Sequence, residues 1–163
     1  MARANASIRA KKPGARKSPE RSRARSRKAV KTATPRRSHK LLVNHLREED
    51  FKLDGLRRYA RYRDLGVKDA THGMAVAHVI RFQGPCDPKL VSKLHRHAAD
   101  FQLIYVLKGK ITSHFEAHGV HTMTAGDAWL QPKNIKHKVL SYSDDCEVLE
   151  IVMPADFKTV ELE

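Results

Sequence analysis

From residue 74 onward, hydrophobic and polar side chains alternate over short segments that end at turn residues. Between residues 74 and 82, for example, Val76, His78, Ile80 and Phe82 fall on one face. A repeat of two residues is the period of a β-strand, whose successive side chains point to opposite faces. Gly, Pro, Asn and Asp separate further segments of this kind, which cover residues 92–97, 101–108, 110–115, 120–123, 128–131, 137–142 and 146–153. Many short strands at this spacing predict an all-β sandwich or barrel.

The first 73 residues do not share this pattern. Residues 41–73 carry apolar side chains at irregular spacing, which fits either a short helix or an extended arm lying on the barrel. Residues 1–40 contain no Leu, Phe, Tyr or Trp, so they cannot bury enough apolar surface to offset the entropy of ordering them. We therefore divide the chain into a disordered basic tail (residues 1–40), a connecting arm (residues 41–73) and a barrel (residues 74–163).

The net charge of +14 belongs to the basic tail. That tail holds fifteen Lys and Arg residues against one acid, Glu20, whereas residues 41–163 hold seventeen basic and seventeen acidic side chains. Clustered cations bind a phosphate backbone in a salt-dependent way, and without aromatic side chains such binding to nucleic acid would be non-specific. An organelle transit peptide and a solvated extension without a partner are the two alternatives.

Cysteine content and hydropathy limit the class of protein. Cys86 and Cys146 are the two cysteines, which favours reduced thiols in a cytoplasmic protein over a disulfide framework. No apolar run reaches the roughly 18–20 residues that a membrane span needs, and no apolar segment follows the N-terminal charges as in a secretory signal. We expect a cytoplasmic protein with no membrane partner.

Three histidines and one glutamine stand where a barrel could bring them together. His95 and His97 are two residues apart on one predicted strand, so both imidazoles point to the same face. Gln102 begins the next predicted strand, and His137 begins another, on which Val139 and Ser141 are expected to share its face. Neutral imidazoles on adjacent inward positions can share one metal ion. The pattern predicts one divalent transition metal on His95, His97 and His137, with Gln102 as the fourth candidate ligand.

These residues stand in two spaced motifs. The first runs from His95-Arg96-His97 through Gln102 to Gly109, and the second from Gly126 through Pro132, Lys133 and Asn134 to His137. Both resemble, in order and spacing, the two motifs of the cupin superfamily, and the short separation between them is that of small single-domain cupins. The resemblance covers roughly residues 74–153.

The resemblance implies a double-stranded β-helix, or jelly-roll, barrel that is commonly a homodimer and holds a metal near one mouth. Carried over by position, the ligands are His95, His97, His137 and Gln102, which stands where the family usually has Glu. Gly109 and Gly126 would be turn glycines, and Pro132 would fix the approach to His137. Two further departures are Asn134 in place of a turn glycine and Ser141 in place of an Asn.

The change at Gln102 alters the expected chemistry. An amide is a neutral donor, so three histidines and Gln102 leave the full charge of the metal to attract an anionic ligand. If Gln102 does not bind, a three-histidine site with open positions remains, as in some cupin-type dioxygenases. The ligand set suits Fe, Ni, Cu, Zn or Mn without choosing among them. A cupin that has lost its metal is the alternative.

Several other side chains have two interpretations each. His78 is expected in the core or in the pocket wall, and Trp129 and Tyr142 could line the pocket or pack in the core. Leu103, Tyr105 and Leu107 form the outward face of their predicted strand. An apolar outward face suggests a cover, either a second subunit or residues 41–65.

The preferred function is a metal-dependent, dioxygenase-like enzyme that acts on a small anionic or enolisable molecule. Against it, no Asp or Glu within the motifs is placed to face the metal. The alternative is a non-catalytic ligand-binding or sensor cupin, associated with nucleic acid through its basic tail. A storage role and a sugar isomerase or epimerase are less favoured, the last because it needs carboxylate bases.

Overall fold

The computed structural model describes residues 37–162, and the basic tail lies outside them up to residue 36. Within the described part, strands dominate and the helices are single turns. In chain order the elements are η1 (Glu48–Asp50), β1 (Ala60–Asp64), α1 (Val67–Ala70), β2 (Val76–Phe82), α2 (Pro88–Val91), β3 (His95–His97), β4 (Phe101–Lys108), β5 (Lys110–Phe115), β6 (Gly119–Thr124), β7 (Ala128–Leu130), β8 (His137–Tyr142), β9 (Glu147–Met153) and β10 (Thr159–Glu161).

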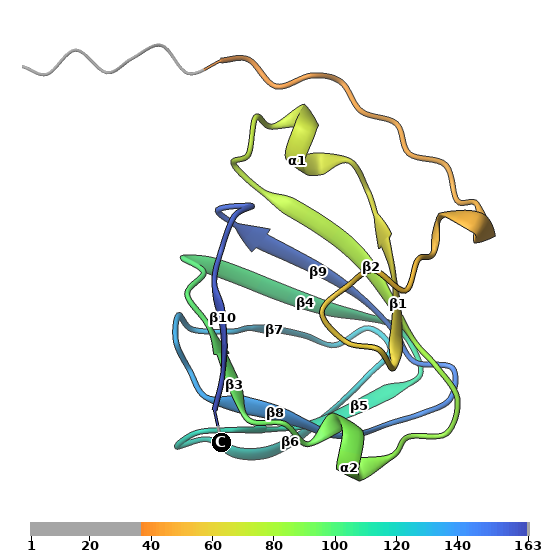
Figure 1. Cartoon of the computed structure of the whole chain (residues 1–163), viewed down its shortest axis with the longest axis vertical. Helices are drawn as coiled ribbons and strands as arrows, with labels where there is room; N and C mark the ends of the chain where they lie inside the picture. The colour runs from red at the N-terminus through yellow and green to blue at the C-terminus, as the bar shows by residue number, and fades with distance from the viewer. Residues whose placement is uncertain (1–36, 163) are drawn as a thin grey trace, which may run out of the picture. The chain divides into compact units, whose positions relative to one another are not determined.

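The strands form two five-stranded antiparallel sheets, in the orders β1-β2-β9-β4-β7 and β10-β3-β8-β5-β6. The two sheets face each other in Figure 1, and their inner faces enclose the core. Ile80, Ile104, Val106, Ile111 and Val148 are buried there. Their alternate positions along the strands are those that the period-two pattern selects. The predicted all-β jelly-roll barrel is confirmed.

Two strands lie outside the segments that the alternation selects. Residues 60–64, which we assigned to the connecting arm, form β1 and pair with β2 at the edge of the first sheet. Arginines at residues 61 and 63 obscure the period of this strand, although Arg63 is itself buried. The three residues of β10 pair with β3, and a strand so short has no detectable period. Conversely, β3 begins at His95 instead of residue 92.

A β-bulge in β8 corrects one expected orientation. Ser141 was expected on the same face as His137 and Val139, but it is exposed. The register with β5 shifts between Ser113 and Thr112, which leaves one extra residue on β8. Such an extra residue reverses the parity beyond it. Tyr142 therefore turns inward and packs in the core, not in the pocket.

Positive backbone φ angles mark the turns of both motifs. Gly109 and Gly126 have φ of 69° and 98°, as expected for turn glycines, and Asn134 has φ of 63°. Asn tolerates this region better than other residues with a Cβ, which explains why it can stand in for glycine. Asn134 donates its backbone N–H to the His97 carbonyl at 2.9 Å, so this turn joins the two motifs.

The outward apolar face of β4 is open in a single chain. Tyr105 and Leu107 are 41% and 44% exposed, and Leu130 on the neighbouring β7 is 59% exposed. The connecting arm does not cover them, because it continues into β1 at the opposite edge of this sheet. Cover by a second subunit stays a prediction.

Both cysteines are free thiols, and no helix of residues 37–162 has the length and apolar character of a membrane span.

Candidate metal centre

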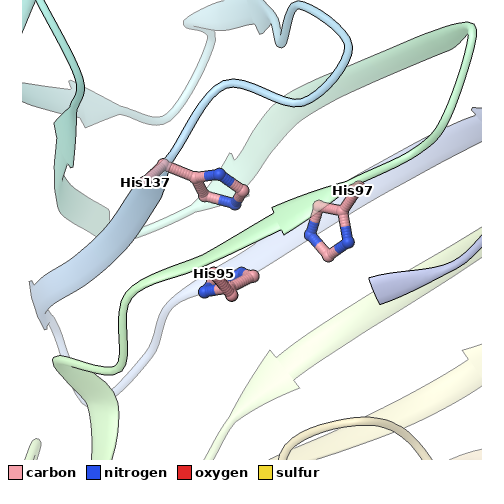
Figure 2. Close-up of side chains that lie close together, drawn as sticks. All are labelled: His95, His97 and His137. Atoms are coloured by element: carbon pink, nitrogen blue, oxygen red, sulfur yellow. The ribbon is translucent and has the colours of Figure 1, made fainter. Parts of the chain in front are cut away.

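The three histidines come together between two neighbouring strands. His95 and His97 lie on β3, and His137 begins β8 directly opposite His95. All three side chains are buried, and one ring nitrogen of each lies within 4.8 Å of the others. Figure 2 shows the three rings turned toward a common space between their strands. This geometry could hold a metal ion.

Backbone carbonyls orient two of the rings. The Nδ1 of His95 lies 2.8 Å from the Lys93 carbonyl oxygen, and the Nδ1 of His137 lies 3.0 Å from that of Ile135. A carbonyl oxygen can only accept, so each Nδ1 carries the proton and each Nε2 keeps its lone pair. This is the tautomer that a metal ligand through Nε2 needs.

The third ring has a side-chain partner from the last strand. The Nδ1 of His97 lies 2.8 Å from Thr159 Oγ1 on β10. The Phe157 ring meets the His97 ring edge-on, with 5.6 Å between centroids. The pairing of β10 with β3 therefore fixes the orientation of His97.

Burial keeps the imidazoles neutral. It lowers the pKa of His95 to about 4 and that of His97 to about 3, with repulsion from His137 as the next cause. Burial also lowers the pKa of His137. The positive charge of Arg57 acts in the same direction on all three rings. Near neutral pH the lone pairs are thus unprotonated, and the donor set fits a divalent transition metal.

The side chain of Gln102 lies in the same site. It is buried on β4, and its Nε2 donates to Glu150 Oε1 at 2.7 Å. Its Oε1 accepts from Gln131 Nε2 at 2.7 Å, and Gln131 Nε2 is also 3.1 Å from His137 Nε2. The Glu150 carboxyl thus fixes which end of the Gln102 amide faces Gln131 and His137.

Glu150 is a carboxyl group in the pocket that our sequence analysis did not place there. It sits on β9 opposite His78 of β2, and burial raises its pKa against the effects of the Gln102 hydrogen bond and of His78. A signal for it exists in the sequence, because Glu150 shares inward parity with Val148 and Val152.

A cavity of about 640 Å³ opens over the histidines. Its wall combines side chains of both sheets with side chains of the connecting arm. His78 and Trp129 line it, as one interpretation of each predicts, and so does Arg57. Arg57 precedes β1, and no sequence pattern indicates that it reaches this pocket. A cavity of this size suits a small organic molecule.

The comparisons with known proteins bear on this site. The family model described as "Cupin domain" matches residues 87–152, which include all four candidate ligands. No curated protein matches the chain at a significant level.

Solved structures of similar fold include several cupins. KdgF from Halomonas sp. aligns over 69% of this chain and 94% of its own, with 18% identity and a TM-score of 0.54. The polyketide cyclase RemF from Streptomyces resistomycificus aligns over 75% and 87%, with 16% identity and a TM-score of 0.58. Oxalate decarboxylase from Bacillus subtilis covers 78% of this chain with 35% of its own, at 17% identity and a TM-score of 0.54. Residues 87–152 are therefore a cupin domain, and the described chain shares its fold with these structures.

Proposed function

We propose that the protein binds one divalent transition metal on His95, His97 and His137, with Gln102 beside it. With this metal it would act as a dioxygenase-like enzyme on a small anionic or enolisable molecule. The observation that carries the proposal is the convergence of three neutral imidazoles, each with one unprotonated ring nitrogen, in a cavity of about 640 Å³.

The donor set supports this chemistry. Three imidazoles and an amide carry no charge, so a bound divalent ion would act as a strong Lewis acid with open positions for an anion or for O₂. The protein contributes orientation through the partners of each imidazole and of Gln102. It also contributes a cavity beside them, lined by side chains of both sheets.

A relative of similar fold supports the metal. The oxalate decarboxylase of Bacillus subtilis has Mn(II) centres, although its identity to this chain is only 17%. Fold alone does not transfer a reaction, so the proposal rests on the residues of this site.

The first test is metal content. We expect about one equivalent of metal per protomer of the full chain, and loss of that metal in His97→Ala. The His97→Ala variant should also unfold at a lower temperature than the loaded protein, since a ligand bound only to the native state adds about 2.7 kcal/mol at a hundredfold excess over its Kd.

The control for this test is His118→Ala. His118 is an exposed histidine in the β5–β6 turn, and its replacement should leave metal content and unfolding temperature unchanged. If His97→Ala retained stoichiometric metal, the site assignment would be wrong.

Turnover separates the two candidate functions. An enzyme of the proposed type, loaded with Fe(II), should consume O₂ with a small enolisable carboxylate. Tight binding of a small molecule without turnover would favour the alternative, a ligand-binding or sensor cupin.

A further inference from the structure

Arg57 lines the cavity over the histidines. Only 11% of its side chain is exposed, and Nη1 donates to Glu161 Oε1 on β10 at 2.5 Å. Its Nη2 is buried and has no hydrogen-bond acceptor among residues 37–162. A buried charged donor without an acceptor is costly, so this nitrogen marks a place where an acceptor is missing.

The connecting arm holds Arg57 in this place. Lys52 and Tyr62 exchange backbone hydrogen bonds of 2.9 and 2.8 Å, which ties the arm to β1. Between them, Gly55 packs so closely on the Tyr62 ring that a Cβ there would lie 2.0 Å from a ring carbon. The Arg57 carbonyl then accepts from Ala60 at 3.1 Å in a turn that leads into β1. The backbone that carries Arg57 is therefore held in place.

The position of Arg57 relative to the histidines defines what could bind. Arg57 and all three histidines line the same cavity. A molecule seated on the histidine side of the cavity can thus meet Arg57 with a second group. Two other cations line the cavity, but Arg47 is paired with Asp50 and Lys52 is exposed.

We propose that Arg57 binds the carboxylate of a small organic acid whose other oxygen group lies at the histidine site. This inference rests on the proposed function and names its substrate class. One free guanidinium nitrogen can satisfy one carboxylate oxygen with a charge-assisted hydrogen bond. Arg57 lies outside residues 87–152, so the cupin motifs would supply the metal and the arm would supply the selection of substrate.

The test uses pyruvate as probe, because it carries one carboxylate and one keto oxygen. Its Kd is measured for the full chain loaded with Co(II), through the visible spectrum of the metal. Arg57→Gln should retain its metal and raise the Kd for pyruvate by about tenfold or more, as loss of a hydrogen bond to a charged group implies. Arg58→Gln, which removes the same charge from the exposed neighbour, should change the Kd less than about twofold.

Imidazole, a neutral metal ligand, is the second probe. Its affinity should be nearly the same in Arg57→Gln and in the unaltered protein, because it does not need the guanidinium. An equal loss for both probes would mean that the substitution damages the metal site, and would overturn the proposal. So would an unchanged Kd for pyruvate, or tighter Arg57-dependent binding of inorganic phosphate than of pyruvate.

A failure of the proposed function has a different signature. If the protein took up no metal, pyruvate binding would be followed on the metal-free protein by the line width of ¹³C-labelled pyruvate in NMR spectra. Broadening that Arg57→Gln abolishes and Arg58→Gln preserves would support the Arg57 site without the metal. Equal broadening in all three proteins would overturn it.

Discussion

The hydroxyl group of Thr159 is the side-chain partner that orients the His97 ring. Thr159 Oγ1 lies 2.8 Å from His97 Nδ1 and comes from an edge strand of three residues. Thr159→Val keeps the shape of the side chain and removes this partner. Loss of such outer contacts typically costs 10- to 100-fold in metal affinity. We expect a loss in that range, measured by competition with a chelator for Zn²⁺.

Thr159→Ser provides the matched control for this prediction. Serine keeps the hydroxyl at the same place and loses only a methyl group, so the affinity should stay within about threefold of the unaltered protein. Equal affinity of the Val and Ser variants would show that the hydroxyl does not orient His97.

At the residue scale, the sequence predicts which side chains come together in the site. It predicts less well which hydrogen-bond partners orient them. His95, His97, Gln102 and His137 follow from strand parity and from motif spacing, and the structure brings all four to one pocket. The contact with Thr159 depends on which strand pairs with β3, and pairing between distant segments leaves no local pattern. The residues that sequence reasoning missed are therefore those that reach the site through tertiary contacts.

Gly109 shows how one turn constrains the elements around it. It links β4 to β5 with φ of 69°, and a Cβ there would lie 2.3 Å from Ser143 Oγ and 3.0 Å from Cys146 Cα. The Ser143 hydroxyl is held by the Lys110 N–H at 2.9 Å and cannot move freely. We expect Gly109→Ala to lower the free energy of unfolding by about 2–4 kcal/mol, the sum of a left-handed backbone and overpacking.

Gly119→Ala isolates the backbone part of that loss. Gly119 has φ of 80°, and a Cβ there would meet nothing within 4 Å. Its cost should be only about 1–2 kcal/mol. Urea unfolding followed by circular dichroism gives both values. Equal losses for the two variants would contradict the role of the close approach to Ser143.

At the element scale, alternation predicts the long strands and fails where the ladder is irregular or short. β4, β5 and β9 bury alternate side chains against the facing sheet, so their period is visible in the sequence. The bulge in β8 inverts the parity after Val139, which explains the wrong orientation of Ser141. β1 was missed because its alternation is carried by Tyr62 between two arginines, not by aliphatic side chains.

At the scale of the whole molecule, the connecting arm and the last strand, β10, meet beside the pocket. Arg57 of the connecting arm binds Glu161 of β10, and β10 also presents Thr159 to His97. The cupin motifs alone therefore do not complete the site, because both its rim and the orientation of one candidate ligand come from segments outside residues 87–152. A family model could predict the ligands but not these additions.

The basic tail differs in charge from the part of the chain that contains this site. Residues 1–36 contain thirteen basic side chains and one acid, whereas residues 37–163 contain nineteen basic and seventeen acidic side chains, a net charge of only +2. We expect removal of residues 1–36 to leave metal content and unfolding temperature unchanged, because the described contacts of the site lie within residues 37–162. Retention on immobilised heparin should be lost, because a neutral barrel releases few counterions from a polyanion.

A column of immobilised duplex DNA tests the electrostatic cause. For the full chain, the logarithm of the binding constant should fall linearly with the logarithm of salt concentration, with a slope of about 0.9 per phosphate contacted on duplex DNA. The truncated protein should show almost no slope. Equal retention of both proteins would place the polyanion contact on the barrel, and a lower unfolding temperature after truncation would move the start of the folded unit upstream of residue 37. Unchanged unfolding with lost retention would instead assign the two properties, a metal site and a polyanion arm, to separable parts of one chain.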